Sequence, residues 1–434
     1  MVRRDAVAEY VRGSLWALPT VVAVVALVAG MVLSLLPSEA NSPFDFQGTA
    51  DDARSLLIGI SSTMVTVIAL LLGLAVVALQ LSSTQFSPRL LRNFLRDRPN
   101  QLVLSVFVGT FVYSAAGLFT VGVTAGSRTE NYPRLAVSVA IVLLFVSLAL
   151  LVYFADHLAH SIQVDRIMRV AESATLEVIP TDTAVAPPPP PWAVLVPALR
   201  SGYVQTVDAA HLAARAARAG LAGVSLVQGT GEHVVAGTPL ATVWTATGDG
   251  AGPAPAEAAR VVDACVRMGW ERTFEQDPGL GVRQLVDIAC KALSPGINDP
   301  YTAVQATEHL GVVFSALAAT PDGDRVARSG DTVVVVPQRT FAEHLSLGCG
   351  LIRRYGAAEP TVAQALLRML GVCARLGTVE HLAAVAEEAA LIVAQAQRAD
   401  MLAADLAEVQ ASAAELGDLL EGRVVAVSSS SARR

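Results

Sequence analysis

Four long apolar stretches dominate the first third of the chain, and none of them contains an Asp, Glu, Lys or Arg residue. They cover residues 15–36, 56–81, 102–123 and 135–154. Each is close to the ~20 residues that an α-helix needs to cross about 30 Å of hydrocarbon. We therefore expect an α-helical integral membrane protein whose four transmembrane helices lie within residues 1–170.

The arginines between these stretches predict the orientation in the membrane. Four of them lie between the second and third stretches, whereas Arg54, in the segment after the first stretch, stands among acidic residues. Cytoplasmic loops of membrane proteins are enriched in Arg and Lys. This bias predicts that both termini and the large C-terminal half lie in the cytoplasm.

Small and polar residues recur along the second stretch at spacings that keep them on one face of a helix. They include Gly59, Ser62, Thr66, Gly73 and Gln80. The opposite face is bulky and suits lipid or neighbouring helices; it carries Leu57, Ile60, Met64, Leu71 and Leu74. The second stretch is therefore the candidate functional helix of the membrane region.

Two interpretations of this stripe are open. Small residues let helix backbones approach closely, and the third stretch offers Ser105, Gly109 and Ala116 at matching spacing. Alternatively, the stripes of several subunits line a narrow polar pathway on the axis of a homo-oligomer, closed or gated near Gln80. The absence of ionisable residues from the stretches favours packing, since such residues usually mark ion or proton routes.

A basic amphipathic segment follows the second stretch. Apolar residues alternate with arginines here, and Ser87 and Pro88 form a helix start signal. The arginines are Arg89, Arg92, Arg96 and Arg98. The pattern predicts a cytoplasmic interfacial helix at about 86–98 whose arginines contact anionic lipid head groups. Such a helix serves either as a topology anchor or as a gating lever.

The second half of the chain is predicted to be a mainly α-helical (α+β) cytoplasmic domain. The prolines at 187–191 require extended backbone and mark a linker, residues 171–192. Val-rich segments with glycines between them predict a small β-rich module over 193–247, with a helix at 209–219. A helical domain over 256–434 follows; we expect its helices at 256–268, 282–293, 302–319, 341–355, 361–376 and 379–420, with one strand at 332–336.

A glycine- and proline-containing turn at 292–303 is the candidate ligand site of this domain. Its polar residues are Ser294, Asn298, Asp299 and Tyr301. Gly296 is expected to take a positive φ, and Asp299 to cap a helix that has Pro300 in its first position. These roles explain most of the motif structurally, but free backbone amides at the helix start can also hold an anion or a phosphate-bearing ligand.

Several function classes are disfavoured. The net charge of −7 argues against nucleic acid as a partner, and no H-E-x-x-H or G-x-S-x-G motif is present, so we expect no enzyme activity. Lys291 is the sole lysine, so the segment 229–243, although similar to the turn of biotinyl and lipoyl domains, cannot attach such a cofactor. Asp156, His157 and His160 lack a clear fourth ligand, so we expect no metal.

Four segments together resemble the bacterial predicted membrane proteins grouped as domain of unknown function 2254. They are QLSSTQFSPRLLRNFLRDR at 80–98, VFVGTFVY at 106–113, GYVQTVD at 202–208 and QLVDIACKALSPGINDPYTA at 284–303. The resemblance supports the four-span interpretation and implies a location in the bacterial inner (plasma) membrane. It implies no catalytic or ligand-binding residues.

Two function hypotheses follow from these patterns. The first is a homo-oligomeric channel or transporter for ions or small solutes with a regulatory cytoplasmic domain, based on the stripe of the second stretch. The second is a membrane-anchored sensor or scaffold that binds a small ligand or a protein through the large cytoplasmic domain. Four spans exceed what anchoring requires, which favours the first hypothesis.

Overall fold

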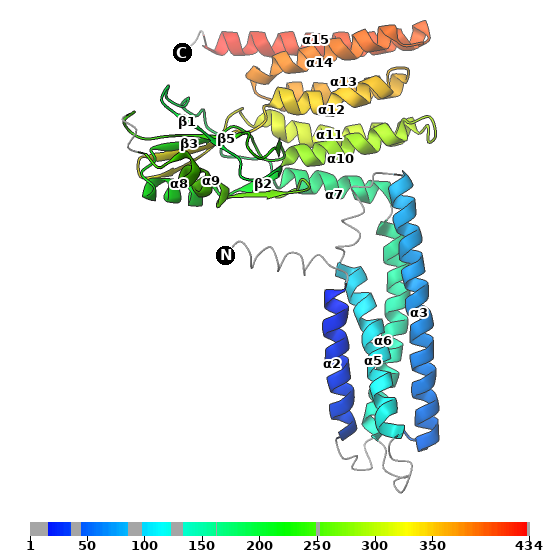
Figure 1. Cartoon of the computed structure of the whole chain (residues 1–434). Helices are drawn as coiled ribbons and strands as arrows, with labels where there is room; N and C mark the ends of the chain where they lie inside the picture. The colour runs from blue at the N-terminus through cyan, green and yellow to red at the C-terminus, as the bar shows by residue number, and fades with distance from the viewer. Residues whose placement is uncertain are drawn as a thin grey trace. The chain divides into compact units, whose positions relative to one another are not determined.

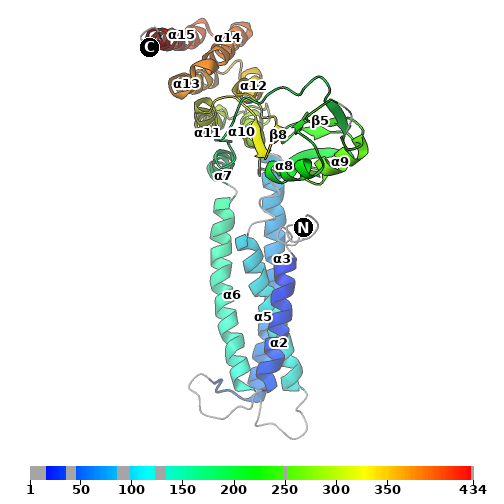
Figure 2. The same cartoon turned by 90° about the vertical axis from the view of Figure 1, so that its left-hand side faces the viewer.

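The computed structural model describes residues 16–35, 45–85, 98–122, 133–161, 163–248 and 252–431. The chain divides into two compact units, Met1–Arg166 and Ile167–Arg434. The described residues are mostly helical, and the strands all belong to the second unit (Figures 1 and 2). We call the first unit the membrane unit and the second the C-terminal unit.

The described part of the membrane unit consists of long apolar helices that run alongside one another (Figures 1 and 2). They are α2 (Ala17–Leu35), α3 (Ala50–Gln85), α5 (Arg98–Gly122) and α6 (Arg134–Ser161). Among the described residues, three segments have the length and apolar composition of a membrane span: Ala50–Val77, Arg98–Phe119 and Arg134–Leu158. The first predicted stretch forms a shorter apolar helix, Ala17–Leu33.

Helix α5 is the central helix of this bundle. Half of its apolar window is buried within the structure, compared with 17% for α3 and 22% for α6. Val103 and Phe107 of α5 are each 1% exposed and pack with Leu57 and Ile60 of α3. The bundle is therefore organised around α5, and α3 and α6 leave most of their surface free.

Buried hydroxyl groups of the membrane unit form hydrogen bonds between helices. The hydroxyls of Thr110 on α5 and Ser147 on α6 lie 3.0 Å apart, and both residues are fully buried. The Tyr113 hydroxyl donates to the backbone carbonyl of Ala136 at 3.0 Å. These bonds satisfy polar atoms that would otherwise be costly to bury in an apolar bundle.

Helix α7 (Val164–Leu176) lies at the start of the C-terminal unit. It is amphipathic and buries Met168, Ala171 and Thr175. Gly281 packs so closely against Thr175 that no Cβ would fit between them. The first six residues of the linker predicted at 171–192 belong to α7, because their apolar face continues the helix.

The strands form two sheets. One has the order β1-β5-β3-β8-β7 and the other β4-β2-β6. The strands are β1 (Val194–Pro197), β2 (Gly202–Val207), β3 (Gly223–Leu226), β4 (His233–Val234), β5 (Pro239–Trp244), β6 (Val266–Gly269), β7 (Arg325–Ser329) and β8 (Thr332–Val336). Neighbouring strands are antiparallel except β3 and β8, which are parallel.

The sheet region is thus not confined to residues 193–247. Strand β8 has the predicted bounds, but β7 was not expected, and β6 overlaps the end of the segment 256–268 that was predicted to be helical. The helix there, α9 (Pro255–Asp263), ends early because the next residues pair with β2. Partners far along the chain decide this strand, and a local helical pattern cannot reveal them.

The remaining helices stack in layers beside the sheets (Figures 1 and 2). They are α10 (Pro278–Ala292), α11 (Pro300–Ala319), α12 (Phe341–Tyr355), α13 (Pro360–Leu376), α14 (Leu382–Arg398) and α15 (Ala403–Ser431), while α8 (Ala209–Arg218) packs on β7 and β8. The predicted single helix at 379–420 is wrong. The chain leaves the helical conformation between α14 and α15, where Ala399 is extended, and the two helices pack against each other.

Candidate functional site

The stripe on α3 faces away from the bundle. Gly59, Ser62, Thr66, Gly73 and Gln80 are all exposed. A Cβ added at Gly59 or Gly73 would meet no other atom within 4 Å. The interpretation that these small residues pack α3 against α5 within the chain is therefore wrong.

The bulky face of α3 makes the internal contacts instead. Leu57, Ile60, Met64 and Leu71 are each no more than 3% exposed and belong to the bundle core. At 100° per residue this face lies roughly 180° from the stripe. Large side chains bury more apolar surface and make more dispersion contacts than glycine, so they form the better contact with α5.

The small residues of α5 do serve close packing, but against α2. A Cβ at Gly109 would come within 2.9 Å of Val22 Cγ1, and one at Gly30 of α2 within 2.9 Å of Ala116 Cβ. Glycine at these positions lets α2 and α5 approach closely. The predicted motif on the third stretch is thus a packing motif, with a partner other than the one expected.

The predicted lipid-contacting arginines are only partly described. Arg98 is the first residue of α5 and is exposed. Arg89, Arg92 and Arg96, and most of the predicted interfacial helix, lie outside the described residues. Their contact with anionic lipid stays a prediction.

The turn at 292–303 is held by its own hydrogen bonds. Asp299 caps α11 as predicted, accepting from the Thr302 amide at 3.1 Å and from its hydroxyl at 2.6 Å, and these bonds lower the pKa of Asp299. The positive φ belongs to Asn298, at 53°, and not to Gly296. Asn tolerates this conformation because its short side chain can bond locally.

Few donors in this turn are free for an anion. The amides of Ile297 and Asn298 both donate to the Ser294 carbonyl, and the Asp299 amide donates to Ala292. The Ser294 hydroxyl donates to the Lys291 carbonyl at 2.6 Å, and Tyr301 is 75% exposed. The structural role of the motif is thus accounted for, and ligand binding here stays a prediction without support from the geometry.

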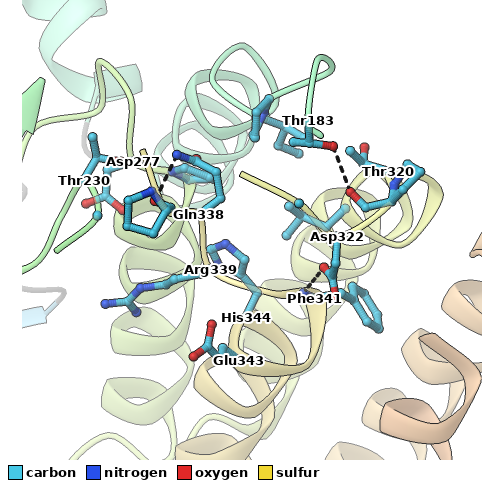
Figure 3. A pocket seen from close by; sticks show the side chains of 18 of the residues that line it. Thr183, Thr230, Asp277, Thr320, Asp322, Gln338, Arg339, Phe341, Glu343 and His344 are labelled. Atoms are coloured by element: carbon cyan, nitrogen blue, oxygen red, sulfur yellow. Dashed lines mark hydrogen bonds between the residues drawn. The ribbon is translucent and has the colours of Figure 1, made fainter. Parts of the chain in front are cut away.

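A polar cavity that the sequence did not reveal lies inside the C-terminal unit (Figure 3). Its volume is about 180 Å³. Five segments line it: 179–183 after α7, 227–232 between β3 and β4, 277–278 at the start of α10, 317–323 at the end of α11, and 337–344 from β8 into α12. The sheet region and the helical layers therefore both contribute to its wall.

Carboxylates outnumber cations in this wall. Glu232, Asp277, Asp322 and Glu343 line the cavity together with one arginine, Arg339. Asp277 is 2% exposed and receives two hydrogen bonds from Arg272, at 2.7 and 2.8 Å. Its charge is thereby neutralised, as the burial of a carboxylate requires.

The other three carboxylates have weaker or partial partners. Asp322 accepts the first amide of α12, from Phe341, at 2.7 Å. Glu343 accepts the Thr340 amide at 2.8 Å in a capping box. Glu232 is 3.6 Å from the Arg339 guanidinium, beyond hydrogen-bond distance.

Two residues of this wall, Arg339 and His344, have a buried nitrogen without a partner among the described residues, and His344 is the more deeply buried of the two. It is 4% exposed, and its Nδ1 is buried without a hydrogen-bond partner among the described residues. Burial, assisted by the positive charge of Arg339, lowers the pKa of His344 to about 4. Figure 3 shows His344 beside Arg339 and Glu343. The imidazole is therefore neutral at physiological pH.

No local motif could have indicated this cavity. Its residues come from positions spread over 179–344, and His344 stands on its helix without a histidine or cysteine at metal-ligand spacing. Within the described part of the chain, no group of three or more His, Cys, Asp or Glu side chains can hold a metal. His160 and Asp156, considered above, lie 3.4 Å apart as a pair.

The chain matches a protein family over most of its length. Residues 12–371 match the family described as "Predicted membrane protein (DUF2254)". Proteins of Mycobacterium tuberculosis and Mycobacterium bovis, both described as uncharacterized, are 43% identical over 438 residues, which is 96% of this chain and 83% of theirs. No solved structure matches. The chain thus belongs to the DUF2254 family of predicted membrane proteins, as its motifs indicated.

Proposed function

We propose that the protein is a homo-oligomeric channel or transporter for ions or small solutes in the bacterial inner membrane. In this proposal α2 crosses the bilayer together with α3, α5 and α6, and both termini are cytoplasmic. The C-terminal unit regulates the membrane unit and performs no catalysis. The observation that supports the proposal is the outward stripe of α3.

The stripe supports association because of what it presents to its surroundings. Lipid tails pack against Leu and Val side chains as favourably as neighbouring helices do. Glycine therefore gives no packing advantage on a helix face that contacts only lipid. Gly59 and Gly73 have open space around them, and Ser62 and Thr66 place hydroxyls on the same exposed face. A second α3 can approach such a face closely, and several can enclose a polar axis.

The first test measures the oligomeric state of the full chain in lipid nanodiscs by native mass spectrometry. We expect more than one copy for the wild type and a shift toward monomer for Gly73→Leu, because the leucine would hold two α3 helices apart. Leu72→Phe is the control, since Leu72 is exposed on α3 and points about 100° away from Gly73. A wild type that is monomeric at every concentration would refute the association.

The second test measures flux through liposomes that contain the verified oligomer. We expect flux of at least one of K⁺, Na⁺ and Cl⁻, and a changed rate for Gln80→Leu at the end of the stripe. If the flux of every tested ion and small solute stays at background, transport is refuted even if the subunits associate.

The second candidate function is a membrane-anchored sensor that does not transport. The specific observation in its favour is the polar cavity of the C-terminal unit, because a pore alone does not need one. Ligand binding without flux would establish this function. Flux without a bound ligand would leave the channel as the better description.

A further inference from the structure

The cavity in the C-terminal unit is sized for a small molecule. Its volume of about 180 Å³ is below the ~300–1,000 Å³ that is typical of pockets for drug-sized ligands. The wall comes from five separate segments, so the folded unit forms it and no single loop does. A ligand of a few non-hydrogen atoms fits this space.

The charge of the wall selects against anions. The Asp277 carboxylate is neutralised by Arg272, and Arg339 can offset one more carboxylate. Asp322 and Glu343 accept backbone amides, and the basic group next to Asp322 is the His381 ring, whose Nε2 lies 3.5 Å from that carboxylate. Arginine therefore offsets two of the four carboxylates and leaves these two. A cation is attracted to this wall and an anion is repelled.

Free acceptor atoms point to a ligand with several donors. In the described part of the chain, Asp322, Glu343 and Glu232 each use one carboxylate oxygen for an internal partner, which leaves the second oxygen available. An ionised carboxylate offers about four lone-pair sites. The wall therefore offers several acceptors that the fold itself does not use, against one unpaired buried donor among the described residues, the Nε of Arg339.

His344 is the independent observation that indicates a ligand. Its ring is almost wholly buried in the cavity wall, and Nδ1 has no partner within the described residues. Buried polar atoms in native proteins are nearly always paired, so an exception indicates a missing partner. The charged groups that act on the ring are Arg339, Arg272 and Glu343, and the ring itself stays neutral at physiological pH, so it adds no repulsion against a cation.

We propose that this cavity binds a small organic cation with a primary ammonium group, whose N–H groups donate to the free carboxylate oxygens and to His344. An ammonium group carries three donors and no acceptor, which matches the unused acceptors of the wall. The proposal concerns the C-terminal unit alone and does not depend on the α3 stripe.

The test uses the purified full-length protein in detergent micelles and follows thermal unfolding by tryptophan fluorescence. Three of the four tryptophans, Trp192, Trp244 and Trp270, belong to the C-terminal unit and report on its unfolding. The probes are ethanolamine and 1,4-diaminobutane, with ethylene glycol as the neutral counterpart and acetate and inorganic phosphate as the anions. We expect the amines to raise Tm by roughly 2–4 °C at a concentration about five times Kd, and by more at higher concentration, and the other probes to leave it unchanged.

Two variants assign the binding to the cavity, with affinity measured by isothermal titration calorimetry. Glu232→Gln removes one carboxylate charge and should weaken amine binding roughly tenfold or more, as expected for the loss of a charged partner. His344→Phe removes the unpartnered nitrogen and should weaken it as well. Glu257→Gln on α9 is the matched control, because Glu257 is exposed and outside the cavity.

The outcomes separate clearly. Stabilisation by acetate or phosphate and not by amines would overturn the assignment in favour of an anion. The absence of a shift with every amine, or an affinity that Glu232→Gln leaves unchanged, would overturn it too. Glu232 is partly exposed, so its variant keeps the test decisive even if His344→Phe does not fold.

Discussion

Helices α3 and α5 carry similar stripes of small residues and use them in opposite ways. On α5, Gly109 and Ala116 face α2. A Cβ added at Gly109 would collide with Val22 of α2, and one added at Gly30 of α2 would collide with Ala116. On α3, Gly59 and Gly73 face outward, where an added side chain would meet nothing within the chain. A small-residue stripe in a membrane helix therefore indicates close approach, but not whether the partner is in the same chain.

Buried polar groups are paired at some positions and unpaired at others, and both cases occur in each unit, since the Ser114 hydroxyl of the membrane unit also lacks a partner among the described residues. In the membrane unit, Thr110 pairs with Ser147, and Tyr113 donates to a backbone carbonyl. In the C-terminal unit, the Nδ1 of His344 has no partner in the described part of the chain. A satisfied pair has a structural role, whereas an unsatisfied atom in a cavity wall identifies a candidate binding site.

The largest expected effect comes from filling the contact between α2 and α5. Gly30→Leu should destabilise the membrane unit by about 2–3 kcal/mol, because the side chain would overlap Ala116 and the Tyr113 carbonyl. Unfolding in SDS, followed by circular dichroism, measures the change. Equal stability of variant and wild type would show that α2 does not pack on α5 as described.

An effect of comparable size is expected for His344 when the pH is lowered. Its pKa in the folded chain is about 4, below the ordinary 6.5, so between these values the unfolded chain binds more protons. Stability should therefore fall as pH drops from about 6.5 to about 4, by up to about 3 kcal/mol from this group. Thermal unfolding across this range should give a flatter profile for His344→Phe, whereas His211→Gln, at an exposed histidine, should follow the wild type.

A smaller effect is expected for the polar pair between α5 and α6. Thr110→Val keeps the shape of the side chain but leaves the Ser147 hydroxyl without its partner at 3.0 Å. The loss should be about 1 kcal/mol, within the range measured for hydrogen bonds between membrane helices. A double-mutant cycle with Ser147→Ala isolates the coupling, and a coupling of zero would contradict the described bond.

The smallest effect, and the one of opposite sign, belongs to the α3 stripe. Gly59→Ala should leave the monomeric unit unchanged or stabilise it by up to about 1 kcal/mol, because alanine favours the helix and meets no neighbour. Unfolding in SDS, where subunits are separated, provides the measurement. A clear loss of stability there would mean that α3 packs inside the chain through its small face.

Much of the architecture follows from local patterns in the sequence. The apolar stretches correspond to α2, α3, α5 and α6, strand β8 and helix α12 have the predicted bounds, and Asp299 caps α11 as its type and spacing indicate. Strand β6 was missed because its partner, β2, is distant in the sequence. Strand β7 pairs with the adjacent β8 across the two-residue turn Gly330–Asp331, so it was missed although its partner is local. The break between α14 and α15 was missed because the Ala- and Glu-rich pattern continues across it.

The sequence by itself determined that this is a membrane protein of its family. Uninterrupted apolar stretches and local motifs can be recognised without knowing any long-range contact. Only the tertiary structure decided which face of α3 is internal, because both faces are compatible with a helix in lipid. It alone brought Glu232, Asp322 and His344 to one cavity, because the β-strand pairings and helix packing that place them join segments more than a hundred residues apart.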